Sequence, residues 1–378
     1  MRVSGMMLAL ALDGVGVMTG PCPAAAGGTG LEFIGEATFP TGYRFRDTEV
    51  GGLSGIDYNR RRGVYYAISD DRSSTSPARF YTLAINLSDG ALDPGDITFR
   101  NVTVILDRTG QPFAPLTVDP ESIRYDRRTG RLLWSSEGDA NALVPPFVRE
   151  MTGSGAFLRE LPASQAYAPT ADQSSGIRNN LAFESLSLAP TGGWGWTATE
   201  NALYQDGPAA AVGQSSPSRM MQFNLGTGSS THEFVYEVEP VVDEPDPAGS
   251  FATNGLVEIL ALGNSRFLTV ERSFSTGKGN VIRLYVADRN GATDIGGDAS
   301  IQGRTVVPMR KRLLADLADF GIVPDNIEGV TFGPRLPDGR RALVLVADNN
   351  FSVTQLTQFL AFALDDDALD DAVVEPVE

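Results

Sequence analysis

Short apolar runs separated by turn-forming residues recur along the whole chain. One region shows the pattern clearly, with apolar runs at 181–188, 195–199, 219–225 and 233–239. Runs of this length, rich in Val, Leu, Phe and Tyr and bounded by Gly, Asp, Asn or Pro, predict β-strands. The 41 glycines and 23 prolines agree with many tight turns. The sequence therefore predicts an all-β protein, with one short helix expected at 313–320, Leu-Leu-Ala-Asp-Leu-Ala-Asp-Phe.

Two short motifs repeat as a pair five times along the chain. The first motif opens a strand, and its five copies begin at Ser54, Glu121, Glu184, Asn254 and Glu328. Each copy is followed by a turn and then by an apolar run that ends in an acid, at Asp70, Glu137, Glu200, Glu271 and Asp348. The copies are roughly 63 to 74 residues apart, which is a spacing typical of repeat architectures.

A repeat of this size with four strands per unit predicts a β-propeller of five blades. The last unit supplies only three apolar runs, and the missing strand is expected from the N-terminus, at 31–39. Pairing the two chain ends in this way closes the ring and removes an open sheet edge. A sixth blade would be needed if 140–175 or 242–252 hides a degenerate unit. The other interpretation is a β-sandwich with coincidental internal similarity.

The chain ends differ in composition from the repeat region. Residues 1–27 combine an early Arg, an apolar run and small residues, which resembles a secretion signal and predicts a periplasmic or secreted protein. An unstructured start is the alternative. We expect the propeller domain at 28–365 and a solvated acidic tail at 366–378. No later apolar run reaches the ~18 residues that a membrane span needs.

Composition restricts the chemistry. The net charge of −17 argues against nucleic acid as a partner, because a phosphate backbone needs cationic protein surface. A single cysteine, Cys22, rules out an intrachain disulfide framework and a Cys-based zinc site. A single histidine, His232, rules out a His-rich metal cluster and argues against a Ser-His-Asp triad. Carboxylates, Tyr, Arg or a metal-bound water would have to carry any acid–base reaction.

The repeated acids are predicted to gather at one mouth of the ring. Antiparallel neighbours place the start of one strand beside the end of the next, so both repeated positions lie on one rim. Like charges at close range repel each other, and a cation relieves the repulsion. An all-oxygen set favours calcium, with magnesium or manganese as alternatives. The expected metal ligands are Asp70, Glu137, Glu184, Glu200, Glu271 and Asp348, although a lone acid at a strand end is more commonly a turn former.

Arginines recur beside these acids. Arg79, Arg219 and Arg283 each open the third strand of a unit. Arg72 and Arg272 follow repeated acids closely. Guanidinium groups bind carboxylates or phosphate oxygens in a bidentate way, so these five either neutralise the acids or bind substrate. Acids, a hard metal and arginines together predict a site for a small-molecule phosphoester, in a monomer, where Glu121, Glu184 and Glu328 activate water.

The motifs also resemble a known family. Gly52-Leu-Ser-Gly-Ile-Asp-Tyr, Asp119-Pro-Glu-Ser-Ile, Phe183-Glu-Ser-Leu, Thr199-Glu-Asn-Ala-Leu, Val270-Glu-Arg-Ser-Phe and Asp325-Asn-Ile-Glu-Gly-Val are similar to motifs of the bacterial phytase-like family, labelled "esterase-like activity of phytase". The resemblance covers about residues 33–362. It implies an exported propeller whose Glu and Asp residues carry phosphoester hydrolysis. A non-catalytic calcium-stabilised binding propeller and a carboxylesterase or lactonase are the competing functions.

Overall fold

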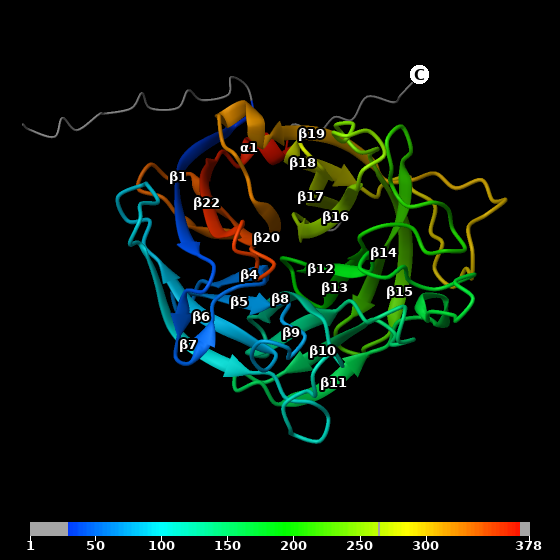
Figure 1. The fold of residues 1–378 in the computed structure, drawn as a ribbon, viewed down its shortest axis with the longest axis horizontal. Helices are drawn as coiled ribbons and strands as arrows, with labels where there is room; N and C mark the ends of the chain where they lie inside the picture. The colour runs from blue at the N-terminus through cyan, green and yellow to red at the C-terminus, as the bar shows by residue number, and fades with distance from the viewer. Residues whose placement is uncertain (1–28, 264, 371–378) are drawn as a thin grey trace, which may run out of the picture.

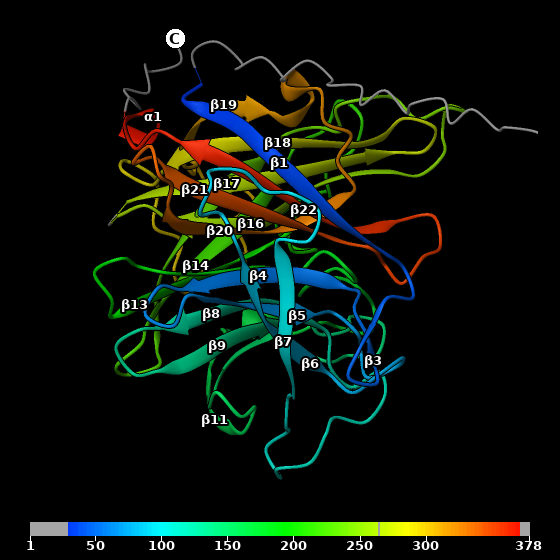
Figure 2. The same ribbon diagram turned by 90° about the vertical axis from the view of Figure 1, so that its left-hand side faces the viewer.

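A computed structural model describes residues 29–263 and 265–370. Five four-stranded sheets are arranged in a ring around a central axis, and a separate two-stranded hairpin lies outside them (Figures 1 and 2). The prediction of a five-bladed β-propeller is confirmed. The predicted secretion signal lies outside the described residues. Among the described residues, no helix is long and apolar enough to cross a membrane.

In each blade, consecutive strands are antiparallel neighbours. Blade 1 consists of β4 (Leu53–Asn59), β5 (Val64–Ser69), β6 (Arg79–Ile85) and β7 (Ile97–Val104). Blade 2 consists of β8 (Pro120–Asp126), β9 (Arg131–Ser136), β10 (Phe147–Met151) and β11 (Phe157–Leu161). Blade 3 consists of β12 (Phe183–Leu188), β13 (Trp194–Thr199), β14 (Ser216–Asn224) and β15 (Ser230–Val238). Blade 4 consists of β16 (Ala252–Ala261), β17 (Arg266–Ser275), β18 (Gly279–Asp288) and β19 (Arg310–Asp316). The first strand of each blade is the innermost, and these inner strands contact one another around the axis.

The ring is closed by strands from both ends of the chain. Blade 5 consists of β20 (Asn326–Arg335), β21 (Arg341–Asp348), β22 (Leu356–Leu364) and β1 (Leu31–Pro40). Strand β1 pairs with β22 from Leu31 opposite Leu364 to Pro40 opposite Leu356. In Figure 1 the blue N-terminal strand lies against the red C-terminal one. The predicted closure by an N-terminal strand is therefore correct, and it leaves no blade with three strands.

Three predictions for single segments need correction, and the alternative of a sixth blade is not realised. The residues predicted as a helix at 313–320 divide into the end of β19 and a 3₁₀ turn, η2 (Leu317–Phe320). The apolar run at 305–309 predicts the fourth strand of blade 4, but that strand is β19. The stretch 140–175 holds β10 and β11 instead of an extra blade, and the predicted tail begins with an ordered helical turn, α1 (Asp367–Asp370). The remaining elements are β2 (Arg44–Phe45), β3 (Thr48–Glu49) and η1 (Gln165–Tyr167).

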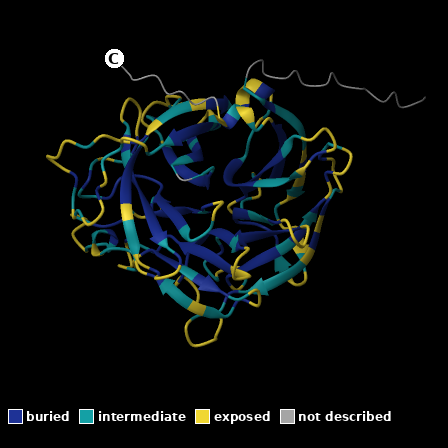
Figure 3. Cartoon of the chain, turned by 180° about the vertical axis from the view of Figure 1, so that it is seen from behind, coloured by how far each residue is buried: buried dark blue, intermediate teal, exposed yellow. Residues whose placement is uncertain are grey.

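The hydrophobic core consists of separate layers between blades. Each of five apolar clusters joins one pair of neighbouring blades. Between blades 1 and 2, for example, Phe80 and Ile68 pack with Ile123 and Trp134. The second strand of a blade is covered on both faces, which explains why β5 and β21 read as continuous apolar runs without polar alternation. Figure 3 shows the consequence, with buried residues on the blades and exposed residues on the connecting loops.

A buried ion pair lies at the axis of the ring, among the inner strands. Arg124 of β8 reaches across the axis and donates to the Ile56 carbonyl oxygen of β4 at 2.6 Å. Its guanidinium also pairs with Glu258 of β16, with 2.6 Å between the closest nitrogen and oxygen. Both side chains are buried. Burial raises the pKa of Glu258 to about 7, although the charge of Arg124 opposes that shift. The cavities at the two mouths of the ring share no lining residue.

Inner strands approach so closely that glycine is required between them. A Cβ added at Gly55 would lie 2.7 Å from the Glu121 carbonyl oxygen and from the Ser122 Cα. We expect Gly55→Ala to lower the free energy of unfolding by about 1–3 kcal/mol, because two backbones must separate. Gly153→Ala is the control, since a Cβ there meets nothing within 4 Å. Urea denaturation of both variants measures the difference, and equal stability would contradict this packing.

Candidate functional site

Every inner strand has a β-bulge, and in four of the five strands the bulge lies near the start, at one rim of the ring. The register of pairing shifts at Ser54 in β4, Glu121 in β8, Glu184 in β12 and Glu328 in β20. Bulges re-aim side chains and are common beside functional sites. In β16 the same shift falls at Val257, not at Asn254 as the sequence repeat suggested.

The second strand of each blade supplies the other half of the rim. In four blades, one residue of the second strand pairs with the residue before the bulge, and an acid directly follows it. These pairing residues are Ser69, Ser136, Thr199 and Ala347, and the acids that follow them are Asp70, Glu137, Glu200 and Asp348. In blade 4 the residue before the bulge, Leu256, pairs with Glu271. The residue that follows is Arg272. Arginine therefore occupies in blade 4 the position that an acid occupies in the other blades.

These positions bring seven carboxylates together, and with Asp119 they form what we call the carboxylate crown: Asp70, Asp119, Glu121, Glu137, Glu184, Glu200, Glu328 and Asp348. A cavity of about 260 Å³ opens among most of them. Carboxylate oxygens of Asp119, Glu121 and Glu137 lie within 4.8 Å of one another, and so do those of Glu137, Glu184 and Glu200. Glu137 is common to both groups.

One arginine is embedded among these acids. The terminal nitrogens of Arg272 lie 3.1 Å from a Glu200 oxygen and 3.0 Å from a Glu328 oxygen. Arg272 also donates to the Asn326 side chain, which in turn donates to Glu328 at 2.9 Å. Arg72 lies at the edge of the cavity and pairs with Asp119 at 3.4 Å and with Asp139 at 2.7 Å. Two arginines thus partly compensate eight acids.

The electrostatics of the crown favour protonation in the absence of a cation. Burial raises the pKa of Asp119 to about 7, and that of Glu137 and Asp348 to about 8. Burial, reinforced by neighbouring carboxylates, raises the pKa of Glu121 and Glu184 well above the usual range. A nearby cation would reverse these shifts, because it favours the charged form.

Asp70 stands out within the crown because its Oδ1 is buried and accepts no hydrogen bond from any described residue. Burial and the charges of Asp348 and Glu328 raise its pKa well above the usual range. A buried carboxylate oxygen without a partner costs free energy. The site therefore has unused oxygen ligands as well as an excess of negative charge.

Glu271, expected among the metal ligands, lies outside the crown. It accepts hydrogen bonds from Tyr236 Oη at 2.8 Å and from the Glu239 amide at 3.0 Å, and it pairs with Lys311. The reason is the register of β17: the apolar run of blade 4 is one residue shorter than in other blades. A shift of one residue turns a side chain to the opposite face of a strand.

Three arginines expected to bind substrate also lie elsewhere. Arg79 is fully buried and pairs with Asp71 at 2.7 Å. Arg219 is equally buried and pairs with Asp206 at 2.6 Å and with Glu233 at 3.2 Å. Arg283 pairs with Asp316 at 2.9 Å at the edge of blade 4. None of the three lines the crown cavity, and their contacts stabilise individual blades.

Two site residues were not among those expected from the sequence. Asp119 precedes the bulge of β8 by two residues. It could have been predicted from the sequence, because it is an acid two residues before the repeated acid Glu121. Asn326 precedes the bulge of β20 by the same interval and links Glu328 to Asp348 through its amide. His232, the only histidine, is about half exposed and pairs with Asp294, away from the cavity.

Comparison with known proteins places the chain in a family. The sequence profile of the phytase-like family, described as esterase-like activity of phytase, matches residues 48–351. No curated protein sequence matches the chain. An endo-arabinase structure from Bacteroides thetaiotaomicron has a TM-score of 0.43 and 11% identity, with 88% of this chain and 97% of that one covered.

Other solved structures are similar at the same low level. A GH43 endo-arabinanase from Bacillus licheniformis has a TM-score of 0.39 and 12% identity, with 86% and 99% covered. A protein of unknown function from Dyadobacter fermentans has a TM-score of 0.42 and 11% identity, with 89% and 100% covered. The family profile, by contrast, spans most of the sequence, including both motifs of each blade. The chain belongs to the phytase-like family.

Proposed function

We propose that the carboxylate crown binds a divalent cation, calcium in first place, and that the protein hydrolyses a phosphate ester there. The observation that carries the proposal is the convergence of eight carboxylates, five of which form two overlapping groups with oxygens within 4.8 Å of one another. So many acids in a buried place are costly unless a cation joins them. Membership of the phytase-like family supports the hydrolytic assignment.

The residues fit a hard cation. Every ligand on offer is an oxygen, and calcium accepts six to eight oxygens at flexible geometry. Glu121, Glu137 and Glu184 would hold the ion, with Asp119 and Glu200 beside them. Magnesium or manganese would bind the same donors with stricter geometry. When bound, the cation supplies Lewis acidity toward a phosphoryl oxygen and toward water.

Arginine side chains complete the site for an anionic substrate. Arg272 and Arg72 both line the crown cavity, from different blades. Arg272 is held by Glu200 and Glu328, so its orientation is fixed before substrate arrives. A preorganised guanidinium stabilises the charge that develops on a phosphoryl group. Asp70, with an unpaired oxygen facing the same cavity, is the candidate for moving a proton.

A larger cleft continues from the crown and offers room for the organic part of an ester. It has a volume of about 970 Å³ and shares Glu200, Arg272 and Asn326 with the rim of the crown. Phe251 and Val323, 67% and 87% exposed, form part of its wall. Exposed apolar side chains beside a charged site favour a substrate with an apolar or aromatic alcohol.

The proposal is tested by hydrolysis of p-nitrophenyl phosphate and bis-p-nitrophenyl phosphate, each with calcium and with chelator. We expect calcium-dependent turnover that falls by about a hundredfold or more in Glu184→Gln, because a group at the reacting centre is lost. Glu244→Gln, an exposed acid outside the crown, is the matched control. A folded protein that binds calcium without turnover on either ester would instead support the binding propeller. Turnover of lactones or aryl acetates alone would favour an esterase.

A further inference from the structure

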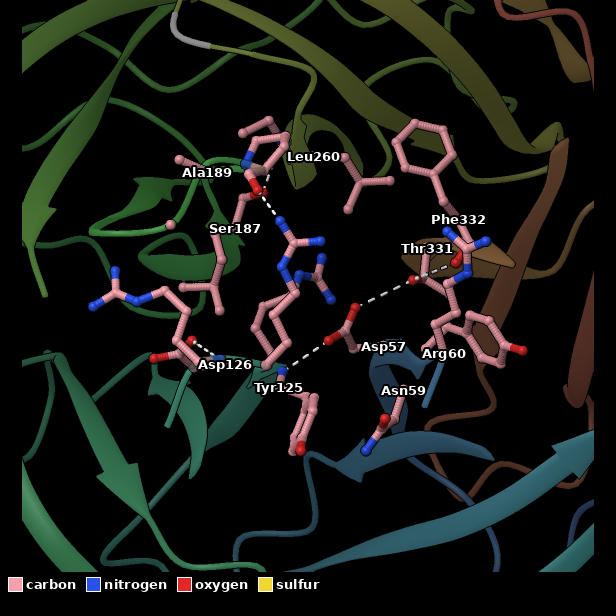
Figure 4. Close-up of a pocket in the computed structure, with 18 of the residues that line it drawn as sticks. Asp57, Asn59, Arg60, Tyr125, Asp126, Ser187, Ala189, Leu260, Thr331 and Phe332 are labelled. Atoms are coloured by element: carbon pink, nitrogen blue, oxygen red, sulfur yellow. Dashed lines mark hydrogen bonds between the residues drawn. The ribbon is translucent and has the colours of Figure 1, made fainter. Parts of the chain in front are cut away.

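The mouth opposite the crown contains a second cavity, of about 680 Å³. It lies where the inner strands end, and its walls come from β4, β8, β12, β16 and β20 and from the turns that follow β4 and β8 (Figure 4). No residue lines both this cavity and the crown cavity. The buried pair of Arg124 and Glu258 lies at the axis between the two mouths.

Two turns with the same residue pattern border this cavity. Asn59-Arg-Arg-Arg-Gly63 follows β4, and Asp126-Arg-Arg-Thr-Gly130 follows β8. The turn conformation depends on the first and last residues. Asn59 Oδ1 accepts a hydrogen bond from the Arg61 amide at 3.1 Å, and Asp126 Oδ1 accepts one from the Arg128 amide at 2.9 Å. The last residues, Gly63 and Gly130, both have positive φ, which glycine adopts without strain.

The turns do not require arginine at their inner positions, yet both turns have a pair of them there. Arg60, Arg61, Arg127 and Arg128 all line the cavity. The chain as a whole has a net charge of −17. Four arginines around one cavity therefore make a local positive charge in an otherwise acidic protein. Clustered cations in a concave site attract anions to that site.

The acids of this mouth are already engaged. Asp57 accepts from the Tyr125 amide at 2.7 Å and from Thr331 Oγ1 at 3.3 Å (Figure 4). Asp126 accepts from the Arg128 amide and from Thr129 Oγ1, both at 2.9 Å. Arg124, 2% exposed, lines the cavity, and its Nε has no hydrogen-bond partner among the described residues. The cavity therefore combines an excess of positive charge with a buried unused donor.

We infer that this second cavity is a binding site for a phosphorylated small molecule. Guanidinium groups on two turns can hold phosphate oxygens in bidentate pairs. Tyr58, Leu260 and Phe332 line the same space and provide apolar contact for an organic part. The volume falls in the range of small-molecule sites and exceeds what a lone phosphate fills. The inference does not rest on the crown being catalytic.

Isothermal titration of the full chain with pyrophosphate tests this site. The titration is done at low ionic strength with chelator present, so that no metal at the crown can bind the anion. Saturable binding is expected, and Arg60→Gln/Arg61→Gln should weaken it roughly tenfold or more, since two charge-assisted contacts are lost. Arg62→Gln is the matched control, because Arg62 is exposed in the same turn but does not line the cavity.

Two further measurements distinguish binding in this cavity from binding at the crown or at a lipid surface. Glu184→Gln should bind pyrophosphate as the wild type does, because the crown is not involved. No binding by the wild type, equal loss in Arg62→Gln, or loss in Glu184→Gln alone would each overturn the inference. Binding to phosphatidylglycerol vesicles without binding to pyrophosphate would also overturn it, because the phosphate would then be recognised only on a lipid surface.

Discussion

Replacing Arg272 with glutamine is expected to destabilise the metal-free protein by about 3–5 kcal/mol at pH 8, the usual cost of removing one partner from a buried ion pair. Glu200 and Glu328 would lose the cation that lies 3.1 and 3.0 Å from them. Urea denaturation in chelator measures the loss. Calcium should recover part of it, because the ion supplies positive charge to the same carboxylates.

Arg283→Gln is the matched control for that experiment. The Arg283 side chain is 31% exposed and pairs with Asp316 at the edge of blade 4. Pairs in contact with solvent contribute about 0–1 kcal/mol, so the control should lose little stability. If both variants lose the same amount, or if calcium has no effect on the loss in Arg272→Gln, Arg272 does not neutralise the crown.

A fall in stability with rising pH is the second large effect expected of the metal-free protein. Burial raises the pKa of Glu137 from 4.5 to about 8, and that of Asp348 from 3.8 to about 8. Between the ordinary and the raised pKa values, the folded protein binds more protons than the unfolded chain, so the free energy of unfolding decreases as pH rises. Stability due to these groups is present below about pH 4 and is lost as pH approaches 8.

The size of the pH effect follows from the same shifts. One pKa unit corresponds to about 1.4 kcal/mol, so the shift of Glu137 from 4.5 to about 8 can by itself account for a loss on the order of 5 kcal/mol. Melting temperatures between pH 5 and pH 8 in chelator measure it. With saturating calcium the slope should disappear or reverse, because the carboxylates then bind the ion in their charged form. A metal-free protein whose melting temperature rises over this interval would contradict the electrostatic description.

The blades could be predicted from the sequence because the repeat is visible in it. Glu121, Glu184 and Glu328 recur at the same place relative to an apolar run, and the fold brings them to one rim. Closure by β1 was also predictable, since the last repeat lacked a strand. For these two features, the repeat in the sequence and the arrangement of the blades agree.

The register in which the strands of blade 4 pair could not be predicted from the sequence. The apolar run of blade 4 looks like the others, but the bulge at Val257 and a run shorter by one residue place Arg272, not Glu271, in the crown. A bulge changes how a strand pairs with its neighbour, and the sequence of a single repeat does not reveal that pairing. The short helix expected at 313–320 failed for a related reason, because pairing with β18 holds Leu313–Asp316 extended despite a helical spacing of apolar residues.

Residues at the axis were missed for a different reason. Arg124 and Glu258 come from different blades and are far apart in sequence, so only the ring closure brings them within 2.6 Å. The arginine pairs in the turns at Arg60 and Arg127 were likewise not singled out in the sequence. These arginines form one candidate binding site only because the fold brings both turns to the same cavity. Sequence repeats therefore located the crown but not the opposite mouth.

Calcium titration by calorimetry tests the central claim most directly. The wild-type chain, freed of metal, is compared with Glu184→Gln, with Glu271→Gln, whose side chain lies outside the crown, and with the exposed control Glu244→Gln. We predict saturable calcium binding that Glu184→Gln weakens strongly and that the other two variants retain. Absence of binding by the wild type, or equal binding by Glu184→Gln, would contradict the assignment of the crown as a cation site.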